Sequence, residues 1–88
     1  MRRDLNWKTK GPDGVAYEVR VTTFGKKFKF QFRNKGEKFW DYERQPSRDD
    51  LEYFRETMER YYQRSRATLH EMEDARKMLA DFDREAAR

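Results

Sequence analysis

Residues 15–42 read VAYEVRVTTFGKKFKFQFRNKGEKFWDY, and apolar and polar residues alternate along almost the whole stretch. Alternation with a period of two is typical of a β-strand that has one buried face and one solvated face. The clearest run is residues 27–34, where three phenylalanines at spacing two alternate with lysine, glutamine and arginine. Positions i and i+2 diverge on a helix, so this run predicts a strand. The stretch therefore predicts the centre of an antiparallel sheet with one apolar face and one basic face.

Turn signals divide this part of the chain into strands. Gly11-Pro12-Asp13-Gly14 fits a type I turn, with Pro at the first corner, Asp at the second and Gly in the left-handed position after it. Gly25-Lys26 and Asn34-Lys35-Gly36 are the other two expected tight turns. We therefore expect a meander with strands over residues 4–10, 15–24, 27–34 and 37–43.

The fourth expected strand is the least regular, because Phe39-Trp40 interrupts its alternation. If Trp40 and Tyr42 face inward, Phe39 faces outward among the basic residues.

A helix is expected to follow Gln45-Pro46. Ser47 is a typical N-cap, and Asp50 three residues later approximates a capping box. Residues 49–87 contain neither Gly nor Pro, and large apolar residues recur at steps of three and four. The prediction is one helix over residues 47–86 that covers the apolar face. The fold class is α+β (ββββα), a three- to four-stranded antiparallel meander packed on one face by a long helix.

That helix would be too long for the sheet. Forty residues span about 60 Å, whereas a strand of eight residues spans about 27 Å. The distal part, residues 66–86, therefore needs its own cover. It could dimerise, break near residues 65–68 and fold back with Thr68 and Glu71 as a second capping box, or stay partly solvated. Dimerisation ranks first, because large apolar side chains rarely line one side of an isolated helix. The candidate interaction residues are Leu69, Met72, Leu79 and Phe82.

The composition fits one small domain, residues 1–88. Charged residues make up 43%, which alone would favour disorder, but two Trp, five Tyr and seven Phe supply apolar area for a core. There is no cysteine, no apolar run long enough for a membrane span, and no apolar segment behind the basic N-terminus. We therefore expect a cytoplasmic protein without disulfides that does not associate with membranes.

The sequence contains no convergent catalytic set, and the expectation is a protein that is not an enzyme. His70 is the only histidine, and Asp74, four residues on, is its expected neighbour on the helix. A metal site would rest on carboxylates alone. We therefore predict no catalytic residues, no metal and no cofactor.

The basic face is the remaining candidate site. Residues 1–46 hold twelve Lys/Arg against six Asp/Glu, a net +6, while residues 47–88 hold nine against eleven, a net −2. Cations beside exposed rings are typical of surfaces that bind single-stranded nucleic acid, and an acidic protein is another possible partner. The alternatives are a face that is charged only for solubility, and a protein-interaction or homodimerisation module that acts through the helix. The candidate nucleic-acid-binding residues are Lys8, Arg20, Lys27, Lys29, Arg33, Lys38 and Phe39.

The run Tyr17-x-Val19-Arg20-Val21-x-x-Phe24, followed by Gly-Lys, resembles the second-strand region of the Whirly and transcriptional-coactivator single-stranded-DNA-binding folds. A four-strand meander followed by a helix is similar to their topology. The resemblance implies a sheet face that holds the nucleic-acid strand and helices that build a dimer.

Overall fold

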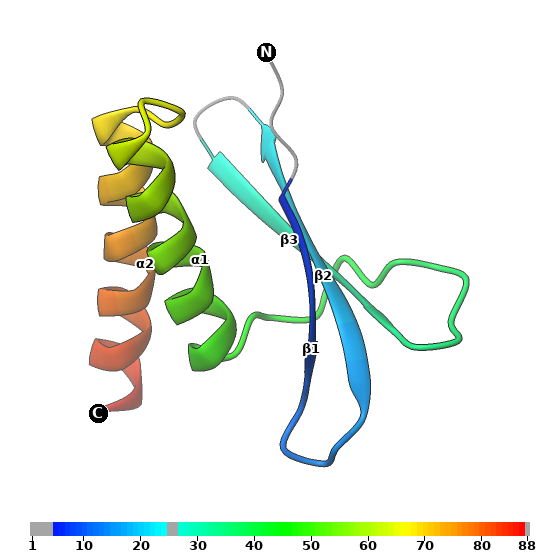
Figure 1. Ribbon diagram of the computed structural model, residues 1–88. Helices are drawn as coiled ribbons and strands as arrows, with labels where there is room; N and C mark the ends of the chain where they lie inside the picture. The colour runs from blue at the N-terminus through cyan, green and yellow to red at the C-terminus, as the bar shows by residue number, and fades with distance from the viewer. Residues whose placement is uncertain (1–4, 25–26, 88) are drawn as a thin grey trace. The chain divides into compact units, whose positions relative to one another are not determined.

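The computed structural model describes residues 5–24 and 27–87. The chain divides into two compact units, Met1–Gln45 and Pro46–Arg88, and the α+β class is confirmed (Figure 1). The first unit contains the strands and the second contains the helices. The elements in chain order are β1 (Leu5–Lys10), β2 (Ala16–Phe24), β3 (Lys27–Asn34), α1 (Arg48–Gln63) and α2 (Leu69–Ala86).

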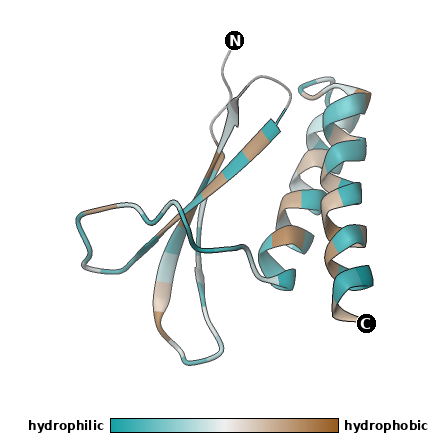
Figure 2. Ribbon diagram, turned by 180° about the vertical axis from the view of Figure 1, so that it is seen from behind, coloured by the Kyte–Doolittle hydropathy of each residue, from teal (hydrophilic) through white to brown (hydrophobic). Residues whose placement is uncertain are grey.

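The sheet is an antiparallel meander in the order β1-β2-β3. Its register places Val19 of β2 between Trp7 of β1 and Phe32 of β3, and it pairs Val21 with Phe30. All five side chains are buried, and Figure 2 shows the alternation of hydrophobic and hydrophilic residues along β3. Burial of a large apolar side chain contributes about 1.5–3 kcal/mol, so these five side chains are the main source of the stability of the sheet. The predicted apolar face is confirmed.

The first predicted turn is also confirmed. Gly14 donates its backbone N–H to the carbonyl of Gly11 at 2.9 Å, and Val15 donates to Oδ1 of Asp13 at 3.0 Å. Gly14 has φ +82°, a conformation that is open to glycine at little cost. The predicted Gly25-Lys26 turn and the first residue of the expected strand 4–10 lie outside the described residues.

The predicted fourth strand, residues 37–43, is wrong. Of residues 37–43, only Asp41 pairs with β3, through two backbone hydrogen bonds to Phe32 of 2.7 and 3.1 Å. The Asp41 carboxylate then accepts hydrogen bonds from the backbone N–H groups of Glu43 and Arg44. An Asp side chain bound to the backbone two residues on bends the chain, and this bend ends the pairing after a single bridge.

The single helix expected over residues 47–86 is two helices. The Ser47/Asp50 capping box begins α1, and a second box, formed by Thr68 and Glu71, begins α2. Between them, Ser65 adopts φ +58°. The backbone N–H of Arg66 donates to the carbonyl of Tyr61, while that of Ser65 donates to Tyr62. This is the Schellman pattern, with Ser65 in the left-handed position that usually holds glycine. Of the three alternatives for the distal part, the break near residues 65–68 is therefore confirmed.

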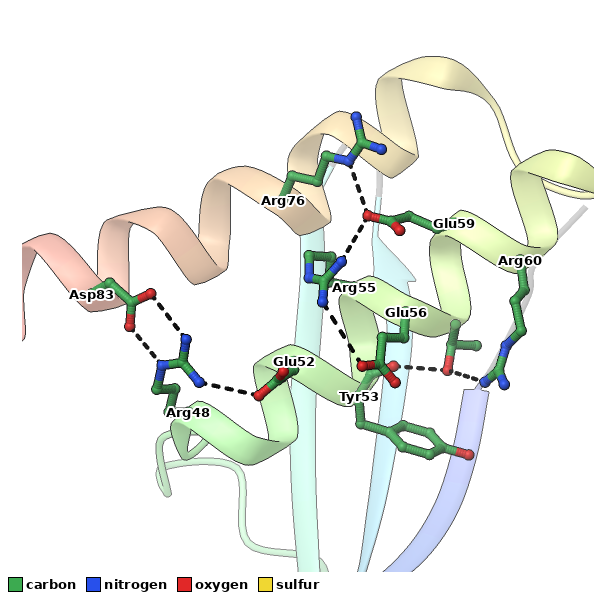
Figure 3. Close-up of polar contacts among 10 residues, drawn as sticks. Arg48, Glu52, Tyr53, Arg55, Glu56, Glu59, Arg60, Arg76 and Asp83 are labelled. Carbon is green, nitrogen blue, oxygen red and sulfur yellow. Dashed lines mark hydrogen bonds and ion pairs between the residues drawn. The ribbon is translucent and has the colours of Figure 1, made fainter.

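The two helices form an antiparallel hairpin (Figure 1), which is linked by two ion pairs between the helices. Arg48, at the start of α1, donates two hydrogen bonds to Asp83 near the end of α2, at 2.8 and 3.3 Å. Glu59 of α1 accepts from Arg76 of α2 at 3.1 Å and from Arg55 at 2.9 Å (Figure 3).

These ion pairs alter the acidity of their members. The hydrogen bond from Arg76, and next that from Arg55, lowers the pKa of the Glu59 carboxyl below its usual 4.5. The hydrogen bond to Asp83 raises the pKa of the Arg48 guanidinium above its usual value. Both effects favour the charged forms, so the hairpin is most strongly held while its carboxylates are ionised. The expectation that the helical region covers the apolar face of the sheet stays a prediction.

Candidate nucleic-acid interface

The face of the sheet opposite the apolar face is the basic face, which we define by the outward residues of the three strands. Register sets Lys8, Glu18 and Arg33 in one row across the sheet and Asn6, Arg20 and Gln31 in the next. The lysines of this face are exposed, while both arginines are half-buried. Alternation therefore brings together five of the predicted binding residues. Lys10 is a sixth cation of this face, and Glu18 is the one carboxylate among its described residues. The five are Lys8, Arg20, Lys27, Lys29 and Arg33.

Gln31 fixes the centre of the basic face. It is only 2% exposed, although it lies on the polar side of β3. Its side-chain oxygen accepts a hydrogen bond from Nε of Arg20 at 2.9 Å, and its amide nitrogen donates to Oγ1 of Thr22 and to the carbonyl of Lys29. Because a buried amide is costly unless its hydrogen bonds are made, this network holds the Arg20 side chain in a defined position.

Trp40 lies on the basic face and not on the apolar face. Its ring contacts both arginines, with the guanidinium carbons of Arg20 and Arg33 at 4.3 and 4.5 Å from the ring centroid. Both distances are within the range of cation–π attraction. Arg33 also donates to Glu18 at 2.9 Å. Two cations that would repel each other are thus held against one aromatic ring, and one of them has a carboxylate partner.

The condition considered for the fourth strand, with Trp40 and Tyr42 facing inward, is not met, because the Asp41 bridge sets both side chains on the other face. Asp41 is paired with Phe32, whose side chain belongs to the apolar face. Neighbours of a paired residue point to the opposite side, so Trp40 and Tyr42 lie on the basic face. The contact of both residues with Arg20 agrees with this, since Nη2 of Arg20 also approaches the Tyr42 hydroxyl at 3.5 Å.

Two rings beside Trp40 are open to solvent. Phe39 is 84% exposed and Tyr42 is 68% exposed. Lys38 is exposed in the same loop. Phe39 is thus exposed in a loop and not in the expected strand. The loop that follows β3 therefore presents accessible aromatic surface next to fixed arginines.

Arg44 was absent from the predicted site and lies elsewhere. Its guanidinium carbon is 4.5 Å from the Tyr17 ring centroid and 5.0 Å from that of Phe32, two members of the apolar face. It also donates to the side-chain oxygen of Asn34 at 3.1 Å. Arg44 thus covers apolar surface with a cation, and its charge does not belong to the basic face.

A groove lies at the end of the β2–β3 ladder. It has a volume of about 590 Å³. The turn that bounds it is closed by a hydrogen bond from the Glu37 backbone N–H to the Asn34 carbonyl, with Gly36 at φ +90°. The groove is lined by Lys8, Ala16, Tyr17, Glu18, Arg33, Asn34, Lys35, Gly36 and Glu37.

The predicted interaction residues of α2 fall into two groups. Met72 and Leu79 are buried in the hairpin, so the helix has already used them for its own packing. Leu69 and Phe82 are 49% and 37% exposed. The fold-back therefore reduces the apolar stripe to two exposed positions near the two ends of α2.

His70 approaches Asp74 at 3.2 Å, as the i, i+4 spacing predicted. Within residues 5–24 and 27–87 no cluster of three His, Cys, Asp or Glu side chains is arranged to hold a metal. Among the described helices none has the length and apolarity to cross a membrane.

Comparison of the chain with protein families, with curated proteins and with solved structures found no match. The resemblance to the four-stranded single-stranded-DNA-binding folds does not extend to topology, because the described sheet has three strands and two helices follow it.

Proposed function

We propose that this protein binds single-stranded nucleic acid, with little sequence preference, through the basic face and the adjacent loop. The observation that carries the proposal is the contact of the Trp40 ring with both Arg20 and Arg33, with exposed Phe39 and Tyr42 in the same loop. Proteins that bind single strands use cations to follow the phosphates and aromatic rings to stack on the bases. Trp40 and Tyr42 contact Arg20 of the basic face, and exposed Phe39 belongs to the same loop.

The parts of the site have different roles in this proposal. Exposed Lys8 and Lys27 attract the backbone by charge, without a fixed geometry. Arg20 and Arg33 are positioned by Gln31, Glu18 and Trp40 before any ligand arrives, so they lose little side-chain entropy on binding. Phe39 supplies the stacking surface, since its ring is almost fully accessible.

Salt dependence tests the electrostatic part. The affinity for a labelled oligothymidine is measured by fluorescence anisotropy over a range of salt concentrations. Contacts to three to five phosphates predict that log K falls by about 2 to 3.5 per tenfold increase in salt. The K27Q/K29Q variant is expected to lower that slope by about 1.4, because two phosphate contacts are lost.

A matched control keeps the total charge change the same. Arg66 and Lys77 are exposed in the helical unit, so R66Q/K77Q removes two charges that do not belong to the basic face. An equal fall in slope for both double variants, or no binding at low salt, would overturn the proposal.

Phe39 tests the stacking part. Loss of one base–ring stack costs about 1–3 kcal/mol, so F39A is expected to weaken binding by about 5- to 150-fold. Tyr62, which is 40% exposed on α1, provides the control variant Y62A, for which no change is expected. If F39A binds with wild-type affinity, Phe39 does not stack on a base. Charge attraction alone would then account for binding, which is what a face that is charged for solubility predicts.

The acidic-protein alternative is decided with the same assay. Polyglutamate is added as a competitor at a charge concentration equal to that of the oligothymidine. Polyglutamate carries charge but no bases, so the exposed rings give it no advantage. The proposal expects weak competition, and equal competition would favour an acidic protein as the partner.

Dimerisation through α2 remains a prediction of lower rank. It rested on a long unbroken helix with an uncovered stripe, and Met72 and Leu79 are buried in the hairpin. Sedimentation equilibrium of the wild type and of an L69K/F82K variant measures it directly. A dimer that is lost in this variant would restore the alternative.

A further inference from the structure

The groove beside Arg33 has features of a small-anion site that the basic face alone does not explain. Three of its lining residues are cations, namely Lys8, Arg33 and Lys35. Its two carboxylates already have partners in the protein. Glu18 accepts from Arg33 at 2.9 Å, and Glu37 accepts from the backbone N–H of Asn34 at 3.1 Å. The groove therefore presents cationic side chains whose charge its own acids only partly offset.

Two parts of the groove lining, Arg33 and the turn of residues 34–37, are held in place by contacts within the protein. The Arg33 guanidinium is fixed by Glu18 and by the Trp40 ring, yet an arginine has five N–H donors and its ion pair with Glu18 uses Nη2. The closed turn of residues 34–37 also lines the groove, and its Lys35 backbone N–H donates to the Ala16 carbonyl at 3.0 Å. A ligand would thus meet a preformed site and would order little of the protein on binding.

We propose that this groove binds a phosphomonoester of nucleotide size, with Lys35 and Lys8 as the contacts to the phosphate and Arg33 as the positioned donor. A volume of about 590 Å³ is in the range of small-molecule sites, and it is larger than inorganic phosphate needs. A monoester carries more charge near neutral pH than the diester of a strand interior, so it gains more from the net positive charge that the three cations leave over the two carboxylates. The choice of a nucleotide rests on the proposed function, because Arg33 belongs to both the groove and the basic face.

The phosphomonoester could be a free mononucleotide or the phosphorylated end of a strand, and the experiment separates these sources. Amide chemical shifts of the intact protein are recorded by NMR during titration with thymidine monophosphate, thymidine and inorganic phosphate, each to millimolar concentration. In parallel, anisotropy compares an oligothymidine with and without a 5′-phosphate. The site is expected to respond to thymidine monophosphate at the amides of residues 34–37 and of Arg33.

Variants assign the response to the groove. K35Q is expected to abolish most of the shift, whereas K77Q, the same change in the helical unit, leaves it unaltered. A strand-end source predicts that the 5′-phosphate strengthens binding by about two- to fivefold, a gain that K35Q removes. A response to the mononucleotide without any effect of the 5′-phosphate identifies the free nucleotide as the source.

Two results would overturn the inference. The first is an absence of shifts at residues 33–37 with thymidine monophosphate. The second is an equal response to inorganic phosphate, which would reduce the groove to a simple anion site. Neither result affects the proposed function, because binding of the unphosphorylated oligothymidine measures the basic face separately. Conversely, the protein could respond to thymidine monophosphate and fail to bind the oligothymidine. That result would refute the proposed function and keep the nucleotide site in the groove.

Discussion

Replacement of Trp40 by leucine removes the ring that joins the two arginines and keeps a large apolar side chain. Each guanidinium lies within 4.5 Å of the ring centroid. A cation–π contact at a partly exposed site contributes about 0.5–1 kcal/mol, so two contacts give about 1–2 kcal/mol. W40L also removes the ring that offsets the repulsion between the Arg20 and Arg33 cations. Of the two arginines, Arg33 is the one with a carboxylate partner. We therefore expect W40L to lower the free energy of unfolding of the sheet unit by about 1–2 kcal/mol.

The sequence supplies its own probe for this measurement. Trp7 is the only other tryptophan, and it is 8% exposed in the apolar face of the sheet. In W40L its fluorescence alone reports unfolding of the sheet in urea. F39L is the matched control, because Phe39 is the neighbouring residue and is 84% exposed; substitutions at such positions usually change stability by less than about 0.5 kcal/mol.

A double-mutant cycle with R33M separates the ring contact from other effects of the leucine. The coupling free energy between positions 33 and 40 is expected to be about 0.5–1 kcal/mol, the size of one cation–π contact. If W40L and F39L are equally stable, or the coupling is zero, the ring does not hold the arginines, and the pre-positioning assumed for the basic face is refuted.

Three further predictions concern the helical hairpin, and far-UV circular dichroism measures each of them. S65G is expected to raise stability by up to about 1 kcal/mol, because glycine adopts φ +58° without the strain of a Cβ atom and the more flexible unfolded chain offsets only part of the gain; a loss of stability would contradict the Schellman ending. T68A is expected to cost about 1 kcal/mol by removal of the second N-cap, and an unchanged melting temperature would show that the cap contributes nothing. The pKa of Glu59 is lowered in the folded state. The contribution of its ion pairs to the free energy of unfolding is therefore present above the unfolded pKa near 4.5 and is lost as the pH falls through the lower folded value. E59Q should therefore be less stable than the wild type at neutral pH, and the difference should shrink as the pH falls below about 4.5, whereas a difference independent of pH would exclude the ion pairs as its cause.

The sheet was largely predictable because its signals are local. Phenylalanines 28, 30 and 32 alternate with polar residues, and Gly11-Pro12-Asp13-Gly14 carries the residues that its turn requires. Side-chain alternation then placed Lys8, Arg20 and Arg33 on one face, without knowledge of the register.

The loop after β3 was not predictable in the same way. The face of Trp40 depends on whether Asp41 or its neighbour pairs with Phe32, and a shift of one residue exchanges the two faces. The side chain that decides this is the Asp41 carboxylate, which bends the chain after one bridge. An aspartate at that position in a sequence is compatible with either outcome.

The break between the helices was partly visible. The second capping box at Thr68 and Glu71 is a readable start signal. The stop signal was concealed, since Ser65 occupies the left-handed position where glycine would have marked the end of α1. Without that mark, a continuous helix with a partner for its stripe remained the better interpretation.

Arg33 connects the two proposed sites, and this determines which substitutions can separate them. It contacts Trp40 on the basic face, pairs with Glu18, and lines the groove. A change at Arg33 therefore disturbs stability, strand binding and groove binding together, and a loss of function in such a variant would be ambiguous. Phe39 and Lys35 avoid this problem, because Phe39 is not among the residues that line the groove and Lys35 lies outside the basic face. If F39A weakens only strand binding and K35Q weakens only mononucleotide binding, then the two sites are distinct and Arg33 is their shared support.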